Sequence, residues 1–242
     1  YMNQNLSEKI DMRLENKKYL SATPILDSDS KIIIDFAMSA IKDADDDPIS
    51  KAVHLYYAVR DGIWYDPYTP FYRPEHYRSS SVLKRGRAFC IPKAGLLCAA
   101  GRACGIPTRL GFADVHNHLA TRQLIDYLGT SIFTYHGFME FYLEGKWVKA
   151  TPAFNKELCH KAKVAPLEFN GREDSIFQPY NEDKKLFMEY LADHGTYADI
   201  PVDEIVEAWK STYGRERVRK WIDFFEKSGG KMKRKFENED IV

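Results

Sequence analysis

Apolar residues recur at helical spacing in several segments of the chain, and the first two segments also carry helix start or stop signals. In the first of them, Ser28-Asp29-Ser30 suits the cap of a helix, and in the second Gly62 follows the last periodic residue. Helices are therefore predicted over residues 28–41, 49–60, 114–128, 183–193, 202–209 and 218–225.

A different pattern occupies the middle of the chain. Residues 135–143 and 146–151 flank Glu144-Gly145, a good signal for a β-hairpin. Residues 108–113 are predicted to form a further strand. Alternation along 135–143 places His136, Phe138, Glu140 and Tyr142 on one face of the sheet.

One more predicted helix carries a thiol at its first residue. Pro92 suits the first helical turn, and Gly105 followed by Pro107 is a stop signal. Cys90 therefore lies at the N-terminal end, where free amide N–H groups and the helix dipole favour the thiolate. The alternative is a small buried hydrophobic residue that opens a helix. Basic residues near the thiol favour the thiolate too, unless they are solvated surface charges: Lys84, Arg85, Arg87 and Lys93.

Composition narrows the class of protein. Of 242 residues, 44% are hydrophobic, enough to build a core. Thirty-five basic residues balance 35 acidic ones, so no overall charge attracts nucleic acid or an anionic membrane. Four irregularly placed cysteines do not form a disulfide framework, and no apolar run is long enough to span a membrane. We therefore expect a cytoplasmic protein that binds neither nucleic acid nor membranes.

A cysteine nucleophile needs a histidine to accept and return its proton, and a third group usually orients the imidazole. His136 lies 46 positions beyond Cys90 (136 − 90), an ordinary separation for two groups that a helix and a sheet bring together. Spacing alone does not establish the pair.

Two ordered motifs surround these residues. The first is Gly86-x-x-x-Cys90 with the run Arg-Ala-Cys-Gly-Ile-Pro-Thr-Arg at 102–109, and the second is His136-x-x-x-Glu140 followed by Gly-Lys-Trp at 145–147. Together they resemble the core of the bacterial transglutaminase-like superfamily, over about residues 50–155. The resemblance implies an α+β, papain-like fold, in which the cysteine helix packs on an antiparallel sheet and C-terminal helices form an extension.

The chain departs from the family pattern at the third catalytic position. Where the family carries Asp, this chain has Thr151, 15 positions beyond His136 (151 − 136). A hydroxyl can accept a hydrogen bond from imidazole, but it carries no charge to stabilise imidazolium. The candidates for the third residue are therefore Thr151 itself, Asn155, or a carboxylate from elsewhere such as Asp114 or Asp174.

The function that the resemblance implies is acyl transfer, or hydrolysis of an amide or peptide bond, through a thioester on Cys90. His136 would act as general base and acid, and the substrate would be a peptide, a protein side-chain amide or a small amide. No cofactor and no metal is expected. The alternative is a catalytically inactive module that binds a peptide or a protein.

A second rival is a metal-dependent hydrolase built on Asp114-x-His116-x-His118, three potential zinc ligands within five residues. In the predicted helix, residues two positions apart do not face each other, which weighs against a metal here.

Neither an internal repeat nor a sharp change of composition divides the chain. We expect a single domain over 1–242, with its core at about 50–155, an N-terminal helical lead-in at 3–48 and a C-terminal extension at 156–228.

Overall fold

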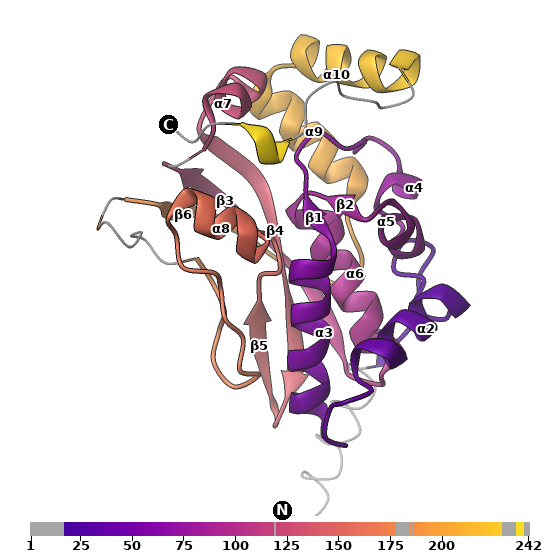
Figure 1. Cartoon of the computed structure of the whole chain (residues 1–242). Helices are drawn as coiled ribbons and strands as arrows, with labels where there is room; N and C mark the ends of the chain where they lie inside the picture. The colour runs from indigo at the N-terminus through magenta and orange to yellow at the C-terminus, as the bar shows by residue number, and fades with distance from the viewer. Residues whose placement is uncertain (1–16, 119, 178–183, 185, 229–235, 240–242) are drawn as a thin grey trace, which may run out of the picture.

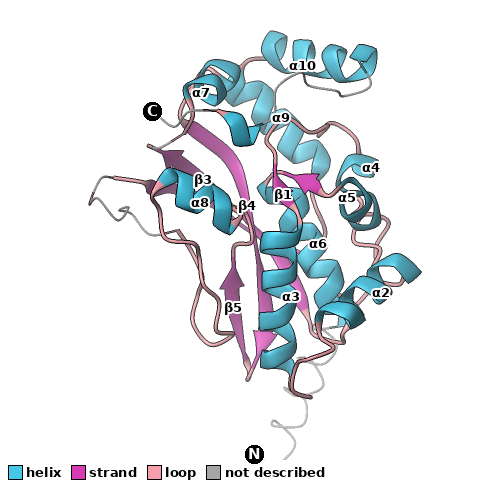
Figure 2. Cartoon of the chain, in the orientation of Figure 1, coloured by secondary structure: helices cyan, strands magenta, loops and turns pink. Residues whose placement is uncertain are grey.

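The structure is a computed structural model and describes residues 17–118, 120–177, 184, 186–228 and 236–239 (Figure 1). Its centre is a four-stranded antiparallel sheet in the order β5-β4-β3-β6. The strands are β3 (Thr108–Asn117), β4 (Ile132–Leu143), β5 (Lys146–Ala150) and β6 (Met188–Tyr197). Figure 2 shows the strands gathered in one sheet, with several helices grouped to one side of it in this view.

The central helix α6 (Cys90–Ala103) packs against β3 and β4, and its residues from Cys90 to Arg102 are all buried. Helix and sheet approach most closely at Gly137, where a Cβ atom would lie 2.9 Å from the Cα atom of Ile91. Only a residue without a side chain fits this contact, because real Cβ atoms do not approach backbone so closely. The predicted α+β core, with the cysteine helix on an antiparallel sheet, is confirmed.

The other elements surround this core. A short parallel pair, β1 with β2, leads into α6. The bounds are α2 (Lys31–Ala40), α3 (Pro48–Gly62), β1 (Trp64–Tyr65), α4 (Pro74–Tyr77), α5 (Ser79–Arg85), β2 (Arg87–Ala88), α7 (Arg122–Leu128), α8 (Lys156–Ala162), α9 (Val202–Tyr213), α10 (Arg215–Ser228) and η1 (Phe236–Asn238).

Segments with strong local signals fold as predicted. Helices α2, α3, α6, α9 and α10 occupy the expected positions, and the side chain of Asp47 caps α3 by accepting from two backbone N–H groups. The β4–β5 hairpin is also confirmed. Its turn residues Glu144 and Gly145 both have positive φ, 47° and 83°, as the tightest hairpin turns require.

The predicted helix over 183–193 is wrong, and the one over 114–128 is wrong in its first half and confirmed from Arg122 to Leu128. Residues 114–117 continue strand β3, and the helix that follows starts only at Arg122, capped by the Thr121 side chain. The segment 183–193, where the structure describes it, leads into and forms most of strand β6. These two stretches hydrogen-bond to each other, Val115 with Tyr190 for example, so a partner about 75 residues away overrides the local periodicity.

Part of the predicted N-terminal lead-in, residues 3–16, lies outside the described residues. In the part of the chain that the structure describes, no helix is long and apolar enough to cross a membrane.

Candidate active site

Cys90 is the first residue of α6, and β4 lies directly against its thiol. The backbone N–H of Gly137 points to the Cys90 sulfur at 3.5 Å. Because Gly137 follows His136, this contact places the strand that carries the imidazole beside the thiol. The close approach of Gly137 and Ile91 makes the contact possible.

Burial opposes ionisation of this thiol. It raises the pKa of Cys90 to about 11, while the backbone N–H groups of Gly137, Ile91 and Cys90 itself lower it. Cys90 is only 9% exposed, so desolvation outweighs the effect of the helix terminus. In this structure the thiol is therefore protonated at neutral pH, and the predicted bias toward thiolate is wrong for it.

The basic residues that were expected to favour the thiolate are engaged elsewhere. Lys93 is fully buried and donates to two backbone carbonyls at the C-terminal end of α3. Arg85 donates to backbone carbonyls, Arg87 pairs with Asp66, and Lys84 is exposed. Three of these four side chains thus bond to neighbouring backbone or carboxylate groups, and the fourth, Lys84, is a solvated surface charge.

His136 lies in β4 and is 5% exposed. Burial lowers the pKa of its imidazole to about 4, so the ring is neutral at neutral pH. Its Nε2 atom is buried and has no hydrogen-bond partner among the described residues, and its ring packs on Phe177 at 5.4 Å between centroids. Within the same residues no hydrogen bond joins the imidazole to the Cys90 thiol.

Cys90 and His136 nevertheless line one pocket. Its walls are mainly aromatic, and they come both from α9 and α10 and from the segment before the cysteine. The main aromatic residues are Tyr65, Phe71, Phe89, Trp209, Tyr213 and Trp221. The C-terminal helices therefore help to build the site, which no local sequence signal reveals.

Thr151 is the first residue after β5 and is 1% exposed. Ala150, the last residue of β5, pairs with Met139 in the strand that carries His136. Its hydroxyl is buried and has no hydrogen-bond partner in the described part of the chain. Thr151, like His136, thus holds a buried polar atom without a hydrogen-bond partner among the described residues.

The other three candidates for the third position have partners elsewhere. The Asn155 side chain accepts from the Tyr65 N–H and donates to carbonyls at the end of α3. Asp174 accepts from a backbone N–H of β5. The Asp114 carboxylate accepts from the Tyr135 N–H at 2.9 Å and lies 2.8 Å from Nε2 of His194.

Asp114 has a role that sequence reasoning missed. Tyr135 adopts a left-handed conformation, with φ of 58°, immediately before His136. The Asp114 carboxylate accepts a hydrogen bond from the Tyr135 N–H, and the His194 ring stacks on the Tyr135 ring at 4.1 Å between centroids. These contacts fix the backbone of β4 immediately before His136. A positive φ at tyrosine gives no signal in the sequence.

Residues 37–152, a little under half of the chain, match the family model of the transglutaminase-like superfamily. Among solved structures, a proposed cysteine protease from Cytophaga hutchinsonii matches at 14% identity and a TM-score of 0.42, over 74% of this chain and 53% of that one. A proposed protease from Parabacteroides distasonis matches at 17% identity and a TM-score of 0.36, over 49% of this chain and 22% of that one. The chain thus spans about half the length, or less, of these two proteins. No curated protein matches it in sequence.

Proposed function

Because residues 37–152 belong to the transglutaminase-like superfamily, we propose that the chain is a cysteine-dependent enzyme that transfers or hydrolyses acyl groups. Its substrate would be a peptide, a protein side-chain amide or a small amide. The observation that carries the proposal is the Gly137 N–H on the Cys90 sulfur, because it brings the thiol and the strand of His136 together at a helix N-terminus.

The reaction would start from a neutral pair. As the Cys90 sulfur attacks the carbonyl carbon, the imidazole of His136 takes the thiol proton, and the backbone N–H at the start of α6 stabilises the oxyanion. The imidazolium then gives its proton to the leaving amine, and a thioester forms. Water or a second amine, deprotonated by His136, attacks this thioester and releases the acyl group, and the proton returns to the sulfur.

Thr151 is the residue we propose for orienting the imidazole. Its hydroxyl would accept a hydrogen bond from His136 once the ring turns toward it, since both groups are buried without partners in the described structure. A hydroxyl stabilises imidazolium less than the carboxylate of the family pattern does, so we expect a slower enzyme than one with a complete triad.

A second candidate function is an inactive module that binds a peptide or protein in the aromatic pocket. The observation in its favour is that burial keeps both groups neutral, with pKa values of about 11 for Cys90 and about 4 for His136. The two candidates differ in whether the imidazole affects the reactivity of the thiol.

The test is the rate at which iodoacetamide alkylates Cys90 from pH 6 to 10, with modified residues identified by mass spectrometry. Cys98 is the internal control, because it lies in the same helix, is fully buried, and burial raises the pKa of its thiol to about 12. We expect Cys90 to react faster than Cys98 at pH 7, and His136→Gln to slow Cys90 by about tenfold or more.

Equal rates for the two cysteines, or an unchanged rate in His136→Gln, would contradict catalysis and favour the binding module. An assay of amine incorporation and of peptide cleavage then separates transfer from hydrolysis. Cys90→Ala should abolish either activity, and Cys98→Ala, the matched change in the same helix, should retain it.

A further inference from the structure

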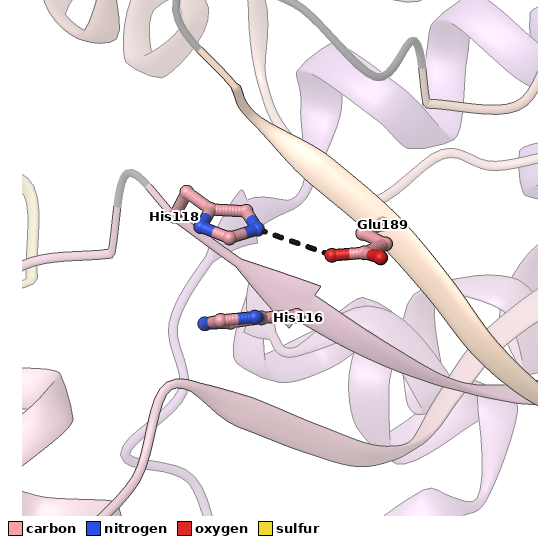
Figure 3. Close-up of side chains that lie close together, drawn as sticks. All are labelled: His116, His118 and Glu189. Carbon is pink, nitrogen blue, oxygen red and sulfur yellow. Dashed lines mark ion pairs between the residues drawn. The ribbon is translucent and has the colours of Figure 1, made fainter.

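Three side chains of types that can bind a metal ion lie close together on a part of the sheet that the proposed reaction does not use. His116 lies in β3, His118 follows the end of that strand, and Glu189 lies in β6 (Figure 3). Residues two positions apart in an extended chain point to the same side, so the two imidazoles lie side by side. Glu189 is the register partner of His116 across the two strands.

The distances among the ligand atoms of these three residues suit groups that bind one metal ion better than a direct ion pair between His118 and Glu189. One ligand atom from each residue can be chosen so that all three lie within 4.8 Å of one another. Nε2 of His118 lies 3.5 Å from the Glu189 carboxylate, longer than the roughly 2.7–2.9 Å of a charge-assisted hydrogen bond. Two ligands of a tetrahedral zinc ion with bonds of about 2.0–2.1 Å are separated by about 3.3 Å.

A hydrogen bond outside the group orients one of its ligands. Nε2 of His116 lies 2.7 Å from the Ser131 hydroxyl. If this nitrogen donates to the hydroxyl oxygen, Nδ1 keeps its lone pair and is free to bind a cation, as in many metal sites with a polar partner behind the histidine. Nε2 of His118 is buried and makes no hydrogen bond within the described residues.

We propose that His116, His118 and Glu189 bind one Zn²⁺ ion, with the fourth position of the tetrahedron open to water. Two imidazoles and a carboxylate are a donor set that zinc uses, and Co²⁺ or Ni²⁺ would enter the same site. Asp114, the third ligand suggested by the sequence, is not part of the group, because it binds Tyr135 and His194 instead.

The ion would fasten the edge strand β6 to β3. Its ligands come from both strands, at the end of the sheet where His118 also donates its backbone N–H to the carbonyl of Phe187. The Glu189 side chain is 53% exposed, so an ion can reach the site from solvent. The site is independent of the proposed thiol chemistry, and its test needs no enzyme activity.

The experiment is zinc titration of the full chain after chelator treatment, by calorimetry and by metal analysis after dialysis. We expect one zinc ion per chain. Glu189→Gln should weaken binding by more than about tenfold, and Ser131→Ala by about tenfold through the lost support of His116. His160→Ala removes an exposed histidine of α8 outside the group and should leave binding unchanged.

Two further readouts separate this site from adventitious binding. Co²⁺ should give the intense visible absorption of a tetrahedral ion in the wild type and lose it in Glu189→Gln. Zinc should raise the melting temperature of the wild type but not of that variant. Glu189 is an exposed residue, so Glu189→Gln will fold even if a histidine variant does not. Absence of stoichiometric zinc, or equal binding by Glu189→Gln and His160→Ala, would overturn the proposal.

Discussion

His136 and Thr151 each hold a buried polar atom that has no hydrogen-bond partner in the described part of the chain. Leaving such an atom unpaired costs about 1–3 kcal/mol. In the reaction that we propose, both atoms would gain a partner, since the imidazole would donate to the Thr151 hydroxyl and exchange a proton with the substrate.

Thr151→Asp tests the third position directly. If Thr151 orients the imidazole as we propose, the new carboxylate lies beside the ring and should raise the pKa of His136 from about 4 toward neutrality. We expect Cys90 alkylation at pH 7 to accelerate several-fold, and NMR titration of the imidazole to show the shift.

The matched change is Thr151→Val, which keeps the shape and removes the hydroxyl. Because that hydroxyl has no partner in the described structure, the free energy of unfolding should change by less than about 1 kcal/mol. A large loss of stability in Thr151→Val would show that the hydroxyl has a partner in the folded protein, and an unchanged pKa of His136 in Thr151→Asp would show that Thr151 does not act on His136.

The buried imidazole also makes stability depend on pH. Its pKa of about 4 in the folded state lies below the ordinary value of about 6.5, so between these values the unfolded chain binds a proton that the folded chain does not. Protonation of His136 therefore has no effect on stability above pH 6.5. As the pH falls below that value, it lowers the free energy of unfolding progressively, by up to about 3 kcal/mol near pH 4.

Urea unfolding at pH 7.5, 5.5 and 4.5 measures this dependence. His136→Gln should lose less stability than the wild type between pH 7.5 and 4.5. The pKa of His76 is also lowered to about 4 by burial, and it contributes equally to both proteins. Parallel curves for the two proteins would mean that His136 is more hydrated than its burial indicates.

At the scale of secondary-structure elements, the contact between α6 and β4 positions the thiol. Gly137 permits the contact, because any Cβ there meets the backbone of Ile91. The same strand brings its N–H to the sulfur of Cys90. Small changes in helix–sheet spacing should therefore alter both stability and thiol reactivity.

Gly137→Ala should push the start of α6 away from β4 and destabilise the protein by about 1–3 kcal/mol. It should also change the alkylation rate of Cys90, since the N–H at 3.5 Å moves. Gly62→Ala is the control, because no atom lies within 4 Å of a Cβ there, and its effect should stay within about 0.5 kcal/mol. Chemical unfolding measures both; equal effects would contradict the close contact.

Local signals predicted most of the elements and two residues of the candidate site. Pro92 and Gly105 bounded α6, and the turn at Glu144-Gly145 defined the hairpin that carries His136. The second half of β3 and β6 were missed because each is a strand only through hydrogen bonds with the other. The same long-range pairing hid Glu189 as a neighbour of His116.

At the scale of the whole molecule, residues 236–239 return to the neighbourhood of the thiol pocket. Glu239 is 5% exposed and accepts hydrogen bonds from the hydroxyls of Tyr68 and Thr121. Phe236 packs on Tyr65, one of the residues that line the pocket. The segment before the cysteine, the start of α7 and the end of the chain are thereby tied together.

Glu239→Ala should leave the hydroxyls of Tyr68 and Thr121 without their carboxylate partner and lower the free energy of unfolding by about 1–3 kcal/mol. Glu239→Gln keeps one acceptor oxygen and should lose less. Urea unfolding of the three proteins at pH 7 tests the order. Equal stability of Glu239→Ala and the wild type would show that the C-terminal segment does not brace the fold.

The order of strands has a consequence for shortened forms of the protein. Strand β6 comes from residues 188–197, after the segment 37–152 that carries the family match, yet it pairs with β3 from Leu110 to Asn117. A chain cut to that segment would expose the backbone N–H and C=O groups of residues 110–117 that now pair with β6, and such an edge is a template on which other chains add as strands. Fragments trimmed to the family boundaries should therefore self-associate through β3, and a protein shortened for study must keep its chain through Tyr197 to keep this edge of β3 paired.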